Sequence, residues 1–215
     1  MSPDPQTPAV LGAIVLSAGE SSRMGGKPKA LLQVGGQPLL VRLLRQLDAA
    51  GFASLAVVTG AHDSEIAAAL AQAGGERPLP NFLRVTNSKW KQGVGTSVRA
   101  GVDALTAANP RLDGVLVTPV DLPCTQDQDW ERLRVVFLDS KRTVAVAHGN
   151  QRIPGTPVLF TTSDALAMAA TLHEGGAKAW LAENEGRIEV LEGPRLTWDA
   201  DTPEALRALL PERSG

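Results

Sequence analysis

Residues 10–29, VLGAIVLSAGESSRMGGKPK, carry the clearest structural signal in this 215-residue chain. The first seven, Val10 to Leu16, form a continuous apolar run, which is typical of a strand buried on both faces of a parallel sheet. Small residues follow, together with three cations, Arg23, Lys27 and Lys29. Backbone N–H groups at close approach and fixed cations are what a triphosphate needs. The stretch therefore predicts a strand that leads directly into a phosphate-binding loop.

This loop differs from the two commonest phosphate motifs. In a P-loop the lysine precedes Ser or Thr, whereas Lys27 precedes Pro28. The dinucleotide pattern G-x-G-x-x-G is also incomplete, because Gly93 and Gly95 are followed by Val98 where the third glycine would stand. The sequence therefore excludes a simple P-loop ATPase and a dehydrogenase with the common dinucleotide-binding pattern.

Composition narrows the class of protein further. The chain has 21 Lys and Arg against 23 Asp and Glu, a net charge of −2, so we expect no nucleic-acid or anionic-membrane partner. One cysteine excludes an intrachain disulfide framework, and the three histidines lack metal-ligand spacing. No apolar run approaches the roughly 20 residues that cross a bilayer. We expect a cytoplasmic protein with a disordered tail over residues 1–8 and a single domain over residues 9–213.

Apolar runs alternate with helical patterns through the first two-thirds of the chain. We predict strands at Val10 to Leu16, Ser54 to Thr59, Phe82 to Thr86 and Gly114 to Thr118, and helices at Pro38 to Ala50, Asp63 to Ala73 and Thr96 to Ala108. In the last third we predict strands over 143–147, 157–160 and, at an edge, 188–191, a turn over 151–155, helices over 162–172 and 176–183, and a final helix capped by Asp201. This order predicts an α/β fold with helices on both faces of a mostly parallel sheet.

Asp121 follows the fourth predicted strand, within GVLVTPVDLP. In an open parallel sheet the ligand lies beyond the carboxyl ends of the strands where the strand order reverses. If the first and fourth strands flank that reversal, Asp121 faces the phosphate loop and is suited to bind Mg²⁺. Asp199 and Asp201 are the candidates for a second carboxylate. Helix capping is the alternative role for Asp121, near Gln126, and for Asp201.

Four motifs in order resemble nucleotidyltransferases related to the molybdenum cofactor cytidylyl- and guanylyltransferases. They are LSAGESSRMGGKPKALL from Leu16, NSKWKQGVGTSVRAG from Asn87, DLP from Asp121, and DADTPE from Asp199. The resemblance runs from about Val10 to Leu210. It implies a Rossmann-like sheet of the nucleotide-diphospho-sugar transferase type.

The resemblance also implies roles for particular residues. Nucleotide base and sugar would be held by Leu16, Ser17, Ala18 and Gly19. Arg23 and Lys29 would bind phosphates and act in catalysis with Asp121, and Asp121 and Asp201 would bind Mg²⁺. Asn87, Gly93 and Ser97 would line the nucleotide and acceptor side. The implied reaction is attack by the terminal phosphate of molybdopterin, or of its molybdenum form, on the α-phosphorus of CTP, with release of pyrophosphate.

Two segments depart from the family pattern. Gly155-Thr156-Pro157-Val158 stands where relatives often read G-H-P-V, and residues 173–178, HEGGAK, stand where they often read G-D-x-G-A-R. A sugar phosphate or polyol phosphate acceptor therefore stays open, as does GTP as the donor, although the methyl group of Ala18 favours CTP. A cofactor-holding chaperone that delivers a pterin without catalysis is a further alternative. A molybdoenzyme or its delivery chaperone would be the implied partner.

Overall fold

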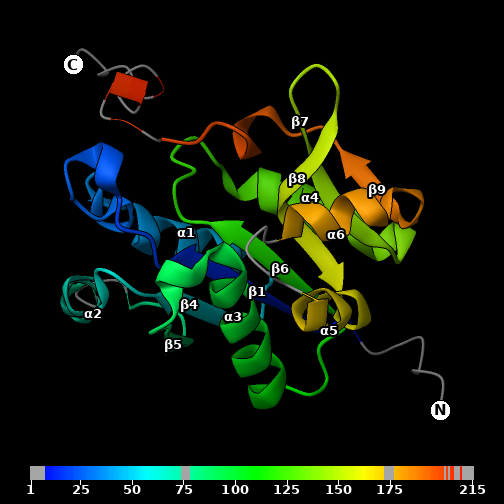
Figure 1. The fold of residues 1–215 in the computed structure, drawn as a ribbon, viewed down its shortest axis with the longest axis horizontal. Helices are drawn as coiled ribbons and strands as arrows, with labels where there is room; N and C mark the ends of the chain where they lie inside the picture. The colour runs from blue at the N-terminus through cyan, green and yellow to red at the C-terminus, as the bar shows by residue number, and fades with distance from the viewer. Residues whose placement is uncertain are drawn as a thin grey trace.

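The structure, a computed structural model, describes residues 8–73, 78–171 and 177–200, together with 202, 204, 205 and 209, and only the backbone of Arg23. In this part of the chain a seven-stranded sheet has the order β5-β4-β1-β6-β8-β7-β9 (Figure 1). The strands are β1 (Leu11–Ser17), β4 (Ser54–Thr59), β5 (Phe82–Thr86), β6 (Gly114–Pro119), β7 (Thr143–His148), β8 (Ile153–Thr161) and β9 (Ile188–Leu191).

The sheet is mostly parallel, as predicted. β1 pairs in parallel with β4 on one side and with β6 on the other, so the first and fourth predicted strands are neighbours. β8 runs antiparallel to both β6 and β7, and β9 closes the far edge parallel to β7. The chain leaves β1 and β6 at the same edge of the sheet, and this edge is where a ligand site is expected.

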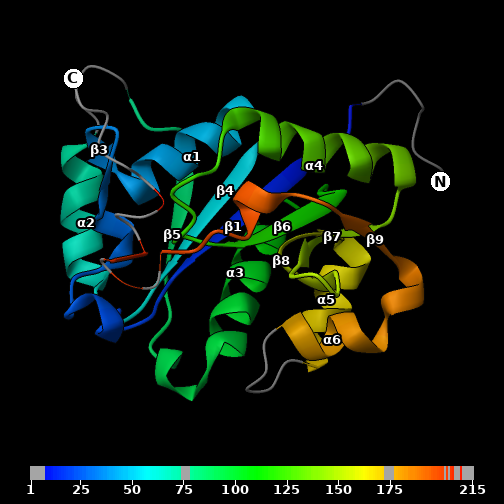
Figure 2. The same cartoon turned by 90° about the horizontal axis from the view of Figure 1, so that it is seen from above.

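Helices cover both faces of the sheet (Figure 2). One face carries α1 (Leu39–Ala49), α2 (Asp63–Gln72) and α4 (Asp127–Ser140), and the other carries α3 (Val94–Ala108), α5 (Thr162–Thr171) and α6 (Ala177–Glu183). Side chains alternate across β1, so Ala13 and Val15 join the core under α1 while Ile14 joins the core under α3. Burial on both faces explains why the β1 sequence is apolar throughout.

The predicted turn over residues 151–155 is wrong in its second half. β8 begins at Ile153, and both Pro154 and Gly155 lie inside it. Proline and glycine favour turns locally, but here the pairing with β7 overrides that preference. The ladder absorbs the irregularity with a register shift between Ala145 and Val146.

A small hairpin was not among the predicted elements. β2 (Gln33–Val34) pairs with β3 (Gln37–Pro38) across Gly35 and Gly36, whose φ angles are 60° and 78°. Two consecutive glycines with positive φ match the type I′ hairpin turn, so the Gly-Gly pair was a usable signal.

The remaining elements are short 3₁₀ turns, namely η1 (Ser22–Met24), η2 (Lys29–Leu31), η3 (Trp90–Gln92), η4 (Glu185–Arg187) and η5 (Pro194–Leu196). Asp201 and Pro203, on which the prediction of a final helix rests, lie outside the described residues, as does the predicted tail apart from Pro8. Among the residues that the structure describes, no helix combines the length and the apolar character needed to span a membrane.

Candidate functional site

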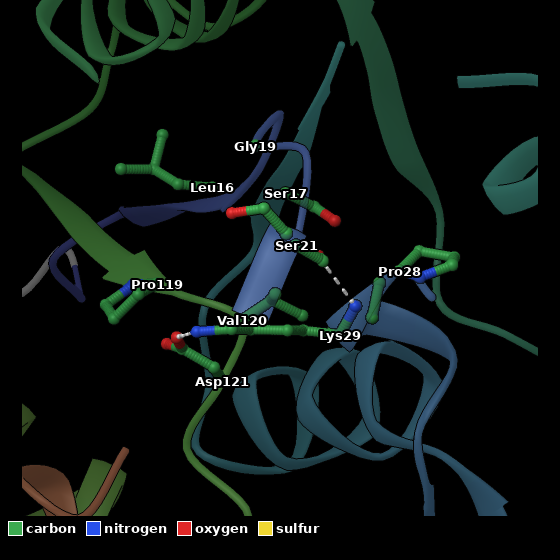
Figure 3. A pocket seen from close by; sticks show the side chains of 11 residues that line it. Leu16, Ser17, Gly19, Ser21, Pro28, Lys29, Pro119, Val120 and Asp121 are labelled. Atoms are coloured by element: carbon green, nitrogen blue, oxygen red, sulfur yellow. Dashed lines mark hydrogen bonds and ion pairs between the residues drawn. The ribbon is translucent and has the colours of Figure 1, made fainter. Parts of the chain in front are cut away.

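A cavity of about 260 Å³ lies where β1 and β6 end (Figure 3). The Val120 N–H donates a hydrogen bond to the Leu16 carbonyl at 3.1 Å, which keeps the two chain exits side by side. The wall is made by the end of β1 and the loop after it, and by the end of β6 and the segment after it: Leu16, Ser17, Gly19, Ser21, Ser22, Pro28, Lys29, Ala30, Pro119, Val120 and Asp121. The predicted phosphate loop and Asp121 therefore share one cavity.

The loop after β1 folds back on itself. Ser21 has a left-handed backbone (φ 52°), which is uncommon for a residue other than glycine, and its Oγ accepts a hydrogen bond from the Lys29 N–H at 3.1 Å. Met24 is buried under the loop, and Lys27 is exposed. These contacts bring Lys29, twelve residues beyond the end of β1 (29 − 17), back to the cavity.

Lys29 and Asp121 form an ion pair across the cavity, with Nζ and Oδ2 2.6 Å apart (Figure 3). Their side chains are 17% and 16% exposed. Asp121 does not cap α4, because Gln126 and Asp129 make a capping box there. The carboxylate of Asp121 thus belongs to the cavity, and the helix-capping alternative for this residue is excluded.

The chain returns to this point near its C-terminal end. The N–H of Ala200, a fully buried residue, donates to the main-chain carbonyl of Asp121 at 2.9 Å. Asp199, which precedes it, is exposed, and Asp201 lies outside the described residues. Among the residues described, no three His, Cys, Asp or Glu side chains gather into a ready-made metal site. One or two carboxylates completed by substrate oxygens and water would nevertheless suit Mg²⁺.

A second cavity of about 650 Å³ adjoins the first and shares Leu16, Gly19 and Pro119 with it. Its walls come mainly from η3, α3, the β7–β8 hairpin and α6. Apolar side chains predominate: Trp90, Val94, Val98, Ile153, Pro154 and Leu181. Polar groups are contributed by Ser97, His148, Thr156 and Lys178. Ala18 also lines this cavity.

Asn87 and Gly93 act behind the cavity wall. Asn87 is buried, and its amide nitrogen donates to Thr96 Oγ1 and Ser97 Oγ, both at 2.9 Å. Gly93 precedes α3 with φ 110°, a conformation that favours glycine. Neither residue lines either cavity, so the structure assigns them to positioning the start of α3, and with it Ser97.

His62 fastens the phosphate loop to the start of α2. Its Nε2 bonds the Glu20 carbonyl at 3.0 Å, and its Nδ1 bonds Glu65 Oε1 at 2.9 Å. Both partners are hydrogen-bond acceptors, so the ring satisfies both as a doubly protonated donor. The Glu20 carbonyl and then the Glu65 carboxylate raise the pKa of His62.

The structure thus gathers Leu16, Ser17, Gly19, Lys29 and Asp121 at the first cavity and Ala18 and Ser97 at the second. The Arg23 side chain lies outside the description. Gly155, Thr156, Ala177 and Lys178, from the two segments that depart from the family pattern, also line the second cavity. Sequence reasoning did not find the apolar wall of this cavity, to which Trp90, Val94 and Leu181 contribute. Nor did it find His62, since no short-range pattern connects it with Glu20.

Comparison with known proteins agrees with this geometry. Residues 13–188 match the family described as "MobA-like NTP transferase domain". The "Bifunctional protein GlmU" of Rhizobium johnstonii is 30% identical over 144 residues, which are 66% of this chain but only 30% of that relative. The chain therefore spans about a third or less of the GlmU proteins that it matches.

A full-length relative is the "Nicotine blue oxidoreductase" of Paenarthrobacter nicotinovorans, 26% identical over 96% of this chain and 99% of its own length. The crystal structure of Rv0371c from Mycobacterium tuberculosis superposes with a TM-score of 0.73 at 24% identity and covers 95% of this chain and 99% of its own. Rv0371c has also been solved in complex with manganese. The match over residues 13–188 shows that this chain belongs to the MobA-like NTP transferase family, a family of nucleotidyltransferases.

Proposed function

We propose that the protein is a Mg²⁺-dependent nucleotidyltransferase that transfers CMP from CTP to the terminal phosphate of molybdopterin, or of its molybdenum form, with release of pyrophosphate. The observation that carries the proposal is the Lys29–Asp121 pair, 2.6 Å apart in a small cavity that opens beside a larger, mainly apolar one. Two adjoining cavities are what a two-substrate reaction requires. Family membership supports the reaction type.

The chemistry asks for alignment and charge neutralisation. The attacking phosphate is already anionic at neutral pH, so no general base is needed. Lys29, and Arg23 by resemblance, would neutralise the charge that grows on the departing pyrophosphate. Asp121 fixes the Lys29 ammonium group by its ion pair. A divalent ion, held by Asp121 and Asp201, would supply further charge neutralisation at the phosphates.

The choice of CTP rests on Ala18. This residue is 7% exposed and lines the second cavity next to Gly19, which lines both cavities, so the base of the nucleotide would lie where the two cavities meet. Its methyl group takes space that a purine could use. A difference of one methyl group is worth about 1–3 kcal/mol, so we expect a preference for CTP over GTP between roughly tenfold and a few hundredfold.

One other function has an observation in its favour. The relative from Paenarthrobacter nicotinovorans acts, by its name, on nicotine blue, and the mainly apolar second cavity would suit an organic molecule with apolar surface. The ion pair in the first cavity has no evident use in such a reaction. A transferase with a sugar or polyol phosphate acceptor is less favoured, because apolar side chains predominate in the second cavity.

The test is incubation of the protein with each of the four NTPs, Mg²⁺ and molybdopterin, with pyrophosphate and dinucleotide product measured together. We expect product with CTP, loss of product with EDTA and none without molybdopterin. Parallel reactions offer sugar phosphates as acceptors, or nicotine blue with a reduced nicotinamide. Pyrophosphate release with a sugar phosphate but not with molybdopterin would show that the acceptor is a sugar phosphate. Dye reduction without pyrophosphate would overturn the transferase proposal.

A further inference from the structure

His148 stands at the edge of the second cavity, at the last position of β7. Its Nε2 bonds the Thr156 carbonyl at 2.8 Å, across the hairpin formed with β8. Because a carbonyl only accepts hydrogen bonds, Nε2 must carry the proton. Within the part of the chain that the structure describes, the other ring nitrogen, Nδ1, has no hydrogen-bond partner.

Gly155 makes room for this ring. A Cβ atom at position 155 would lie 2.7 Å from His148 Cδ2 and 2.9 Å from Nε2, closer than real contacts allow. The φ angle of Gly155 is not in the left-handed region, so the glycine is required for space rather than for backbone conformation. The position of the imidazole is therefore fixed by the Thr156 carbonyl and by the space that the absence of a side chain at Gly155 leaves for the ring.

Two large apolar side chains on the cavity wall remain open to solvent. Val94 is 50% exposed and Ile153 is 47% exposed. Together with Trp90 and Leu181 they offer an apolar lining. An occupant that covers them gains the free energy of apolar burial, so the cavity suits a molecule with apolar faces.

We propose that His148 is a specificity-determining residue that binds the acceptor through Nδ1. With the Nε2 proton donated to the Thr156 carbonyl, Nδ1 accepts a hydrogen bond whenever it carries no proton itself. The matching group is an N–H or O–H on the edge of a heterocycle whose faces contact the apolar wall. This inference rests on the proposed function for the identity of the acceptor, and it assigns His148 to recognition rather than to the transfer step.

The test compares three variants by steady-state kinetics with CTP and molybdopterin. His148→Gln retains an N–H that can reach the Thr156 carbonyl but lacks a counterpart of Nδ1. We expect the KM for molybdopterin to rise about tenfold, with kcat and the KM for CTP within twofold of wild type. Gly155→Ala should displace the ring and raise the same KM. Gly186→Ala is the matched control, because its added Cβ would contact nothing within 4 Å. It should leave kcat and the KM values for molybdopterin and CTP unchanged.

Direct binding separates this inference from the proposed function. The Kd of molybdopterin for the nucleotide-free protein is measured for wild type and for His148→Gln. Turnover by wild type with unchanged acceptor KM and Kd in His148→Gln would overturn the inference alone. Binding without turnover would overturn the proposed function, and the Kd ratio would then decide the inference. If wild type neither binds molybdopterin nor turns it over, both are wrong.

Discussion

At the scale of single residues, we propose that the Lys29–Asp121 pair serves ligand binding rather than stability. Partly exposed ion pairs contribute about 1 kcal/mol or less to folding, because the attraction is offset by lost side-chain entropy and desolvation. These two side chains are 17% and 16% exposed and face a cavity rather than the core. A site that binds phosphate and a cation needs both charges fixed in advance.

Asp121→Asn should therefore impair activity far more than folding. We expect kcat to fall by about 100-fold or more, because a charge that would bind the metal ion and orients Lys29 is removed. The thermal midpoint should change by no more than about 4 °C. Asp103→Asn, on the exposed side of α3, is the carboxylate control and should match wild type. Pyrophosphate release near the wild-type rate at saturating Mg²⁺ would contradict the role of Asp121.

Gly19→Ala tests whether a ligand, rather than the fold, requires the glycine. An added Cβ at position 19 would meet no protein atom within 4 Å, and its φ is not left-handed. The thermal midpoint should stay at the wild-type value. Since Gly19 lines both cavities, we expect the KM for CTP to rise about tenfold as the methyl group blocks close approach of the nucleotide. An unchanged KM, equal to that of the Gly186→Ala control, would exclude Gly19 from the nucleotide site.

At the scale of elements, α2 anchors the loop after β1, which is the predicted phosphate loop. Asp63, the first residue of α2, accepts hydrogen bonds from Thr59 Oγ1 at the end of β4 and from Arg84 on β5. The Thr59 hydroxyl and then the Arg84 guanidinium lower the pKa of Asp63. The helix start is thereby held to two strands, and His62 transmits that position to the loop through the Glu20 carbonyl.

The anchor should weaken as pH rises. The pKa of His62 in the folded protein is raised above the unfolded value of about 6.5. The charged ring therefore stabilises the folded loop fully below about pH 6.5, and this stabilisation is lost as the pH rises through the folded pKa. We expect amides of residues 20–24 to be better protected from hydrogen exchange in wild type than in His62→Phe at pH 5.5. The ratio of the two rates, taken at each pH, should fall as the pH rises, because the charge on the ring is lost while the neutral ring can still donate one hydrogen bond.

Two controls accompany this measurement. Amides of β1, in the core of the sheet, should show no difference between the two proteins at any pH. Glu65 and Glu20 are the acidic groups that act on the ring. A protection ratio that does not vary with pH would show that the charge on His62 does not hold the loop.

Elements could be predicted where local composition and tertiary burial agree. β4 and β5 begin and end at the predicted residues. A short apolar run bounded by turn residues favours a strand, and the bounding residues mark its two ends. The first half of β8 could not be predicted, since Pro154 and Gly155 enter a strand only through pairing with β7. The apolar wall of the second cavity could not be predicted either, because nothing in the local sequence shows that Trp90 and Leu181 line one cavity with Gly19.

At the scale of the whole molecule, the hydrogen bond from the Ala200 N–H to the Asp121 carbonyl returns the C-terminal segment to the end of β6. The two residues are 79 positions apart (200 − 121). Full burial of Ala200 fixes the segment, and acidic residues flank it on both sides in the sequence. This hydrogen bond explains how the last motif of the chain, which begins at Asp199, can lie beside the cavity formed by the loop after β1.

Asp199 and Asp201, the two aspartates of the last motif, differ in their expected contribution to Mg²⁺ binding. Asp199 is exposed next to the anchored Ala200, whereas Asp201 precedes the T-P-E that matches the family pattern. We expect Asp201→Asn to raise the Mg²⁺ concentration for half-maximal activity by about tenfold or more, and Asp199→Asn to leave it within twofold. Because an amide oxygen can still cap a helix, the Asn substitution separates metal binding from folding, and both variants should melt like wild type. If Asp199→Asn alone weakens Mg²⁺ activation, the anchored segment presents its exposed acid to the metal and the two assignments must be exchanged.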